Sequence, residues 1–208
     1  MSVSKNTVTV IFIVDTSGSM YGQKIAAVNA AIAECLAVLR KYQNKNENLM
    51  TGYITFDEKI GNFILKKDLG TVVFKVEPNG SGFYNMTLFS CLYEGMDKVL
   101  RNYQNFRSDL CLFLITDGKP ADSGEYTEPL EKVKSLEPFR RADRYVVLVG
   151  NDVNGMDNDV LEFVGFKANQ VVQLSDLSGV LERMQMLAAD AGSSYADDKE
   201  RYKLIFGD

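Results

Sequence analysis

Two apolar segments of the chain stop abruptly at an aspartate, and hydroxyl-bearing residues lie near both. The segment VIFIV ends at Asp15, and DLCLFLIT ends at Asp117. Ser17 and Ser19 follow the first aspartate two residues apart, so in an extended turn both side chains can point to the same side. Thr87 follows a glycine-containing loop that could fold back over the same edge. Together these residues form a candidate set of two carboxylates and three hydroxyls.

The candidate set contains only oxygen donors, which favours a hard cation. Mg²⁺ and Mn²⁺ prefer octahedral coordination by oxygen, whereas zinc and copper favour nitrogen and sulfur. If the hydroxyls bind directly and a carboxylate binds through water, the ion keeps much of its positive charge. It can then accept an Asp or Glu side chain of a partner protein. The residues therefore predict a metal site that captures an acidic partner.

A simpler interpretation of the same residues is a capped turn. Asp15 could be a helix N-cap, with the hydroxyls that follow it satisfying free backbone amides. Several other aspartates are also expected to be solvated loop or capping residues, namely Asp122, Asp152, Asp157 and Asp159. Among the nearby aromatic residues, Phe83, Tyr84 and Phe89 are either core packing or part of a partner-binding rim. The two strand-ending aspartates with both serines favour the metal site over the capped turn.

Alternating strands and helices must position these residues. Continuous apolar runs predict strands buried on both faces at 8–14, 109–116, 144–150 and 170–174. Two further strands, 50–60 and 62–67, are joined by a short polar turn and are expected to be antiparallel neighbours. Helical spacing of apolar residues predicts helices at 23–41, 88–103, 126–137, 157–165 and 176–190. Pro138 is expected to end the third of these helices, and 71–76 is either a short edge strand or an extended segment.

This order of elements predicts an α/β domain with a mostly parallel sheet and helices on both faces. We expect one domain over residues 1–190 and a separate C-terminal tail over 191–208. Ligands of such sheets bind outside the carboxyl ends of the strands, where the winding direction reverses. If the strands ending in Asp15 and Asp117 are neighbours there, their carboxylates converge on one crevice.

Composition excludes several other classes of function. The 208 residues carry a net charge of −5 with a pI near 4.9, which argues against a nucleic-acid partner. The chain has no histidine, so Ser-His-Asp triads, histidine acid–base catalysis and His-ligated zinc are excluded. No window approaches the roughly 18 apolar residues that a membrane span needs. The N-terminal apolar stretch is interpreted as a strand and not as a signal peptide. The three cysteines, which have no CxxC spacing, are predicted to be reduced core thiols in a cytoplasmic protein, namely Cys35, Cys91 and Cys111.

The candidate residues resemble a known metal site. DTSGS at 15–19, Thr87 at the start of a helix and TDG at 116–118 are similar to the DxSxS…T…D metal-ion-dependent adhesion site (MIDAS) of von Willebrand factor A (VWA) domains. The resemblance covers roughly residues 8–190. Thr87 is preceded by Asn85 and Met86, where the family commonly has glycine.

The resemblance implies a fold and a role for each site residue. The fold is Rossmann-like and doubly wound, with one antiparallel edge strand beside the parallel ones. Ser17, Ser19 and Thr87 are implied to ligate Mg²⁺ or Mn²⁺ directly, and Asp15 and Asp117 to bind it directly or through water. The implied function is a metal-dependent protein-interaction module and not an enzyme.

Within the family, the chain is similar to short, stand-alone bacterial VWA proteins associated with tellurite-resistance and stress-response operons. LITDGKPAD at 114–122 supports that placement. Such relatives are linked to protein kinase and PP2C-type phosphatase partners, which the resemblance implies as candidate partners here.

Two other functions stay open. The chain could be a phosphotransferase or phosphatase in which Asp15 forms an aspartyl-phosphate, with Lys119 contacting a phosphate. Such enzymes usually need a second carboxylate two residues later as general acid–base, and this chain has Ser17 there. The third possibility is a scaffold protein with a vestigial metal site.

Overall fold

A six-stranded sheet in the order β3-β2-β1-β4-β5-β6 forms the centre of the computed structural model. The model describes residues 7–43, 49–66, 69–70, 72–77, 85–103, 108–118, 120–150 and 158–190. The strands are β1 (Thr7–Asp15), β2 (Leu49–Phe56), β3 (Ile60–Lys66), β4 (Ser108–Thr116), β5 (Asp143–Leu148) and β6 (Val171–Gln173). All neighbouring strands are parallel except β2 and β3, which are antiparallel. The predicted fold class, with its antiparallel edge strand, is therefore confirmed.

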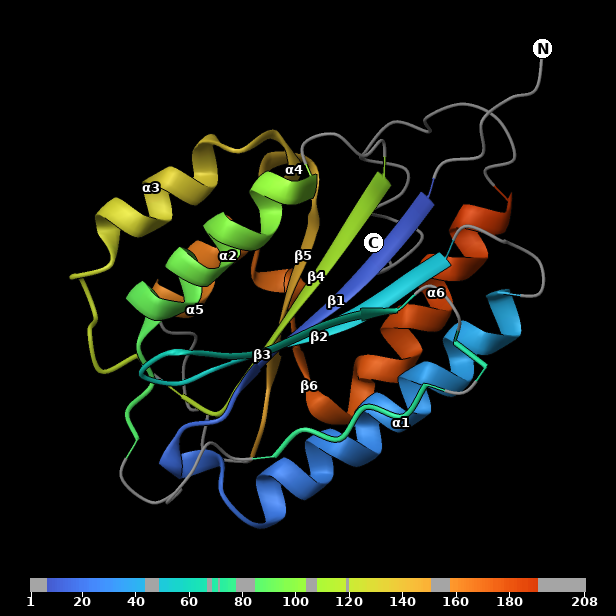
Figure 1. The fold of residues 1–208 in the computed structure, drawn as a ribbon. Coiled ribbons are helices and arrows are strands. Elements are labelled where there is room, and N and C mark those ends of the chain that lie inside the picture. Colours follow the sequence, from blue (N-terminus) through green and yellow to red (C-terminus); the bar gives the residue numbers. More distant parts are fainter. Residues whose placement is uncertain are drawn as a thin grey trace.

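Helices cover both faces of this sheet, with α1 and α6 on one face and α2 to α5 on the other (Figure 1). Their bounds are α1 (Gln23–Gln43), α2 (Phe89–Tyr103), α3 (Thr127–Ser135), α4 (Glu137–Arg141), α5 (Asn158–Phe163) and α6 (Leu177–Asp190). No helix in the described part of the chain is long and apolar enough to cross a membrane.

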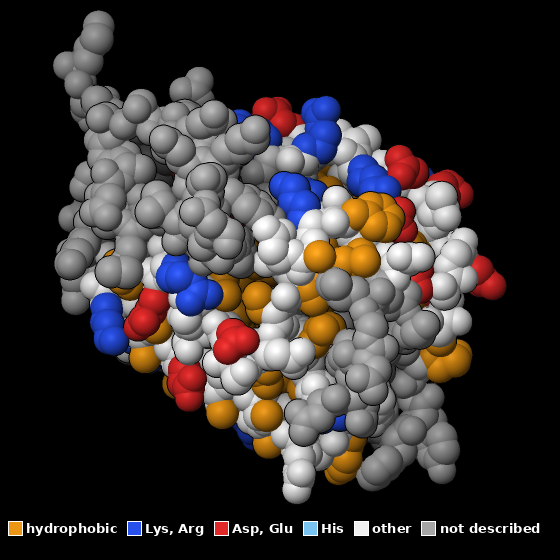
Figure 2. Space-filling model, turned by 180° about the vertical axis from the view of Figure 1, so that it is seen from behind, with side chains coloured by type: hydrophobic (Ala, Val, Ile, Leu, Met, Phe, Trp, Pro, Cys, Tyr) orange, Lys and Arg blue, Asp and Glu red, His pale blue; other side chains and the backbone are white. Residues whose placement is uncertain are grey.

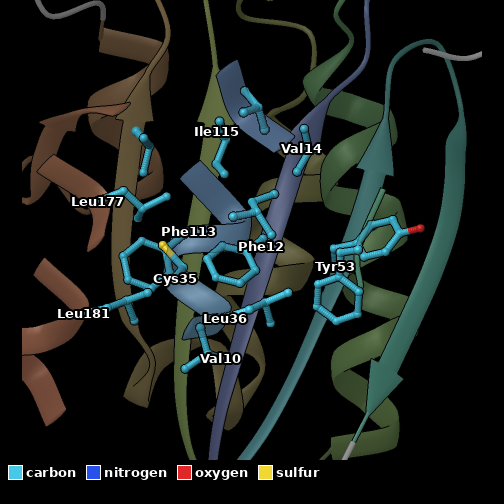
Figure 3. Packing of buried hydrophobic residues seen from close by; sticks show 14 of the residues in the cluster. Val10, Phe12, Val14, Cys35, Leu36, Tyr53, Phe113, Ile115, Leu177 and Leu181 are labelled. Carbon is cyan, nitrogen blue, oxygen red and sulfur yellow. The ribbon is translucent and has the colours of Figure 1, made fainter. Parts of the chain in front are cut away.

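Strand β1 is continuously apolar from Val10 to Val14 because each of its faces packs against a helical layer. Alternate residues point to opposite faces of a strand. Phe12 faces α1 and α6, whereas Ile11 and Ile13 face the layer containing α2. Figure 3 shows Phe12 beside Phe113 of β4, and their ring centroids lie 5.8 Å apart.

The two strands that end near the candidate aspartates are neighbours. In the parallel pairing of β1 with β4, Val14 lies opposite Ile115, so the two carboxyl ends lie side by side. The chain passes from β1 to β2 on one side and from β4 to β5 and β6 on the other. The winding direction therefore reverses between β1 and β4, which is where the sequence places its candidate site.

The segment after β3 is extended and lies along α1, as Figure 1 shows. Residues 72–77 form no regular strand. Instead, the Asn29 side chain of α1 pairs with the backbone of Val76: its Nδ2 donates to the carbonyl oxygen at 2.9 Å, and its Oδ1 accepts from the backbone nitrogen at 2.8 Å. Of the two predictions for this segment, the extended one is correct.

The predicted helix 126–137 is instead two helices. Helix α3 ends at Ser135, and Leu136 is extended with φ −76° and ψ 128°. Pro138 lies in the first turn of α4, where its missing N–H removes no helical hydrogen bond. The prediction that Pro138 ends a helix is therefore wrong, because the residue begins the next one.

Most of the cysteines are buried, and charged side chains of both signs lie at the surface of the described residues. None of the three cysteines forms a disulfide; Cys35 and Cys111 are buried, and Cys91 is partly exposed. On the face drawn in Figure 2, basic and acidic side chains of the described residues are interspersed. The predicted tail 191–208 lies outside the described residues.

Candidate metal site

The five predicted site residues form one continuous chain of oxygen contacts beyond the carboxyl ends of β1 and β4. Thr87 Oγ1 lies 3.2 Å from Asp15 Oδ2 and 2.9 Å from Ser17 Oγ. Ser17 Oγ lies 3.2 Å from Ser19 Oγ, which donates to Asp117 Oδ1 at 2.8 Å. The contact between Ser19 and Asp117 joins residues 98 positions apart in the chain.

Backbone hydrogen bonds hold the three loops of this site against one another. The loop after β1 forms one turn of 3₁₀ helix at Gly18–Met20, and the Gly18 nitrogen donates to the Asn85 oxygen at 2.9 Å. The oxygen of Thr87 accepts from the Ala121 nitrogen at 2.7 Å, which joins this segment to the loop after β4. The hydroxyls are therefore presented by loops with a defined arrangement.

Asp15 is fully buried, with 0% of its surface exposed. Its Oδ1 accepts from the Ser17 nitrogen at 2.9 Å, and its Oδ2 accepts from Thr116 Oγ1 at 2.7 Å. Burial raises the pKa of the Asp15 carboxyl, the hydrogen bonds from Ser17 and Thr116 lower it, and the nearby Asp117 raises it further. The net pKa is above the usual range, because the hydrogen bonds do not fully offset the loss of water. A cation beside this carboxylate would favour its charged form.

Lys24 is a further charged residue at the site, and the sequence reasoning missed it. Its Nζ lies 2.5 Å from Asp117 Oδ2, and the Lys24 and Asp117 side chains are 38% and 4% exposed. Helical periodicity gives no indication of this contact, because Lys24 and Asp117 are 93 residues apart.

Two more carboxylates that the sequence reasoning did not assign to the site support the segment carrying Thr87. Asp57, which is 0% exposed, accepts from Asn85 Nδ2 at 2.9 Å. Asp122 accepts from the backbone nitrogens of Phe89 and Ser90, each at 2.8 Å, and so caps the N-terminus of α2. The capping alternative predicted for Asp122 is thus correct. The signal that could have identified Asp57 is its position at the carboxyl end of β2, since the neighbouring strand β1 also ends at an aspartate, Asp15.

The remaining predictions around the site have mixed outcomes. Phe89 is 0% exposed and packs in the core, so the core alternative is correct for this residue. Asp159 accepts hydrogen bonds from Ser123 Oγ at 2.7 Å and from the Tyr126 hydroxyl. Several named residues lie outside the described part of the chain, namely Phe83, Tyr84, Lys119, Asp152 and Asp157.

Comparison with known protein families identifies the family to which this chain belongs. A family model for the von Willebrand factor type A domain matches residues 9–185, which is most of the chain. The chain belongs to the von Willebrand factor type A domain family. VWA domains are in general protein-interaction modules without enzymatic activity.

The relatives of this VWA domain are distant. It is 27% identical over 135 residues to the VWFA domain-containing protein ORF892 of Acidianus two-tailed virus, covering 61% of this chain but only 14% of the viral protein. Its fold matches the vWF domain of the type V pili tip protein Mfa5 from Porphyromonas gingivalis with a TM-score of 0.60 and 11% identity, covering 93% and 99% of the two chains. Proximal thread matrix protein 1 from the mussel byssus matches with a TM-score of 0.58 and 16% identity, covering 88% of this chain and 48% of that one. These structural matches show the fold alone.

The donor set of this VWA domain fits a hard cation. Within the described ranges, no group of three or more His, Cys, Asp or Glu side chains could hold a metal ion. A cation between Asp15 and Asp117 therefore depends on the hydroxyls for the rest of its protein ligands. Neutral hydroxyl oxygens with one or two carboxylates are suitable ligands for Mg²⁺ or Mn²⁺.

Proposed function

We propose that this VWA domain binds partner proteins through a Mg²⁺ or Mn²⁺ ion held at the candidate site. Ser17, Ser19 and Thr87 would supply direct hydroxyl ligands, and Asp15 and Asp117 would bind directly or through water. The observation that supports this proposal is the continuous chain of four side-chain oxygen contacts that links the five residues at the switch point of the sheet.

When bound, the ion would supply a positive charge to which an acidic side chain of the partner would add as a further ligand. The chain's own residues prepare for this step. Asp15 accepts hydrogen bonds from Thr116 and from Thr87, so it orients the hydroxyl of Thr87, which lies two residues before α2. Because two carboxylates cancel the charge of one divalent ion, binding an external carboxylate depends on one of them contacting the ion indirectly.

The burial of Asp15 favours this role over that of a catalytic nucleophile. An aspartyl-phosphate enzyme must bring a phosphoryl group to a carboxylate oxygen. Asp15 is 0% exposed, and both of its oxygens accept hydrogen bonds. Those contacts favour a carboxylate that holds its neighbours in place.

The biological setting is proposed from the resemblance alone. A cytoplasmic place in a bacterial tellurite-resistance or stress-response system, with a kinase or PP2C-type phosphatase as partner, follows from the similarity of LITDGKPAD to such VWA proteins. An acidic surface loop is the feature that such a partner must present. The domain boundary at residue 190 is part of the same proposal.

Calorimetric titration of Mn²⁺ and Mg²⁺ into the metal-free protein tests the site. We expect about one ion per chain, with binding lost in Ser17→Ala and Asp117→Ala. Ser175→Ala is a matched control, since this serine contacts the exposed Asp176 instead of the site. The titration is repeated with acetate as a stand-in for the partner's carboxylate. Absence of binding under both conditions would contradict the proposal and favour the vestigial scaffold.

A further inference from the structure

The ammonium group of Lys24 already contacts one of the site carboxylates. Its Nζ lies 2.5 Å from Asp117 Oδ2, while Ser19 donates to the other oxygen of the same carboxylate. Both oxygens of Asp117 are therefore engaged. A metal ion that uses Asp117 must meet a positive charge at that carboxylate.

We propose that Lys24 competes with the metal ion for Asp117, so that the ion binds as the lysine leaves. This inference rests on the proposed function, since it concerns how the same site is loaded. Two positive charges a few ångströms apart repel each other, and the repulsion is strongest where water is excluded. Asp117, at 4% side-chain exposure, lies in such a place.

Three parts of the fold position the Lys24 side chain beside Asp117. Its backbone belongs to the first turn of α1, and its carboxylate partner follows β4. The lysine stem passes Gly150, which lies just after β5 with a φ of +100°: a Cβ at this position would be in ordinary van der Waals contact with Lys24 Cε, at 3.5 Å. The stem thus runs beside the end of β5 to reach Asp117.

Lys24 also has a route away from the site. Its side chain is 38% exposed, and a long flexible stem lets an ammonium group move into water without moving the helix. The exchange keeps Asp117 next to a positive charge in both states. The metal-free site is then charge-compensated by Lys24, and the free domain binds metal more weakly than the ligands alone would allow.

The competition also couples binding of the metal ion to binding of the partner protein. A partner's carboxylate adds a ligand to the ion, so it stabilises the metal-bound state and shifts the exchange away from Lys24. By reciprocity, metal binding strengthens partner binding. Because of Lys24, binding of the metal ion depends more strongly on the acidic partner than it would with the oxygen ligands alone.

Titration of Mn²⁺ into Lys24→Met tests the competition. Methionine keeps an apolar stem without the charge. We expect about tenfold tighter Mn²⁺ binding than in the wild type, which is the scale of a charge-assisted contact reduced for partial exposure. Lys132→Met is the control, because it removes the same charge from an exposed pair with Glu128 on α3, and its affinity should match the wild type.

Acetylation of lysines in the wild-type protein gives a second, independent readout. The rate at Lys24, followed by mass spectrometry, should be low in the metal-free protein and should rise at saturating Mg²⁺, while the rate at Lys132 stays unchanged. Tighter Mn²⁺ binding in Lys24→Met without a change in Lys24 acetylation would overturn the exchange, because long-range repulsion would then explain the affinity. Equal Mn²⁺ affinities with unchanged acetylation would overturn it too, yet leave the metal site standing. Absence of Mn²⁺ binding in both proteins, with and without acetate, would instead overturn the proposed function.

Discussion

Replacing Asp122 with alanine should destabilise the domain and weaken its metal site together. The Asp122 carboxylate accepts from the backbone nitrogens of Phe89 and Ser90, both at 2.8 Å, and is 8% exposed. These amides are among the donors that a helix N-terminus leaves without partners. The alanine variant leaves both without their acceptor.

The expected loss in the free energy of unfolding follows from these two hydrogen bonds. A hydrogen bond to a charged group contributes about 1.5–3 kcal/mol. Phe89 is 0% exposed, so water cannot easily replace the carboxylate at its amide, whereas Ser90 is only partly buried. We therefore expect a loss of about 2–4 kcal/mol, including a contribution from the helix dipole. At about 2–4 °C per kcal/mol for a domain of this size, the Tm should fall by roughly 5–15 °C.

Urea unfolding followed by circular dichroism measures the loss, with Asp97→Ala as the control. Asp97 pairs with Arg101 on the exposed side of α2, four residues apart, so its removal should cost only about 0.5 kcal/mol. Mn²⁺ titration completes the assay: affinity should fall in Asp122→Ala but not in the control, because Asp122 secures the start of the helix behind Thr87. Equal destabilisation of the two variants would refute the capping explanation. An unchanged Mn²⁺ affinity in Asp122→Ala would refute the coupling to Thr87.

Two further substitutions test the buried carboxylate and the edge of the sheet. Asp15→Asn should lose Mn²⁺ binding yet stabilise the metal-free protein by about 1 kcal/mol at pH 7. Burial raises the folded-state pKa of Asp15 above its ordinary value of 3.8, so its contribution to stability is present below that value and is lost as the pH rises through the folded-state pKa. The advantage of the variant in urea unfolding should therefore shrink on acidification, and an advantage that grew would contradict the raised pKa. Gly52→Ala should cost about 3 kcal/mol or more in the same assay, because its Cβ would meet the Ile64 oxygen at 2.3 Å. Gly118→Ala, whose Cβ would meet nothing within 4 Å, should reduce the free energy of unfolding much less. Similar losses of stability in the two variants would show that the close contact between β2 and β3 does not explain the effect of Gly52→Ala.

The sequence by itself determined the elements of this protein and the positions at which its strands stop. Continuous apolar runs predict the buried strands, since a strand covered on both faces has no polar side to show. Asp15 and Asp117 stand out because each ends such a run. The sequence left open whether the two strands are neighbours, and the structure shows that β1 pairs with β4 where the winding direction reverses.

Only the tertiary structure decided which other side chains complete the site. Lys24 reaches Asp117 across 93 positions of sequence, and Asp122 caps a helix that begins 33 residues before it. Neither contact can be recognised from a local sequence pattern. The spacing of residues along the chain does not indicate which loops lie together at the end of the sheet. Pro138 shows the same limit at short range: a proline can end one helix or begin the next, and here the packing of Phe139 in the core accompanies the second outcome. Periodicity specifies what each segment buries, whereas the charges at the site depend on distances that exist only after the segments have packed.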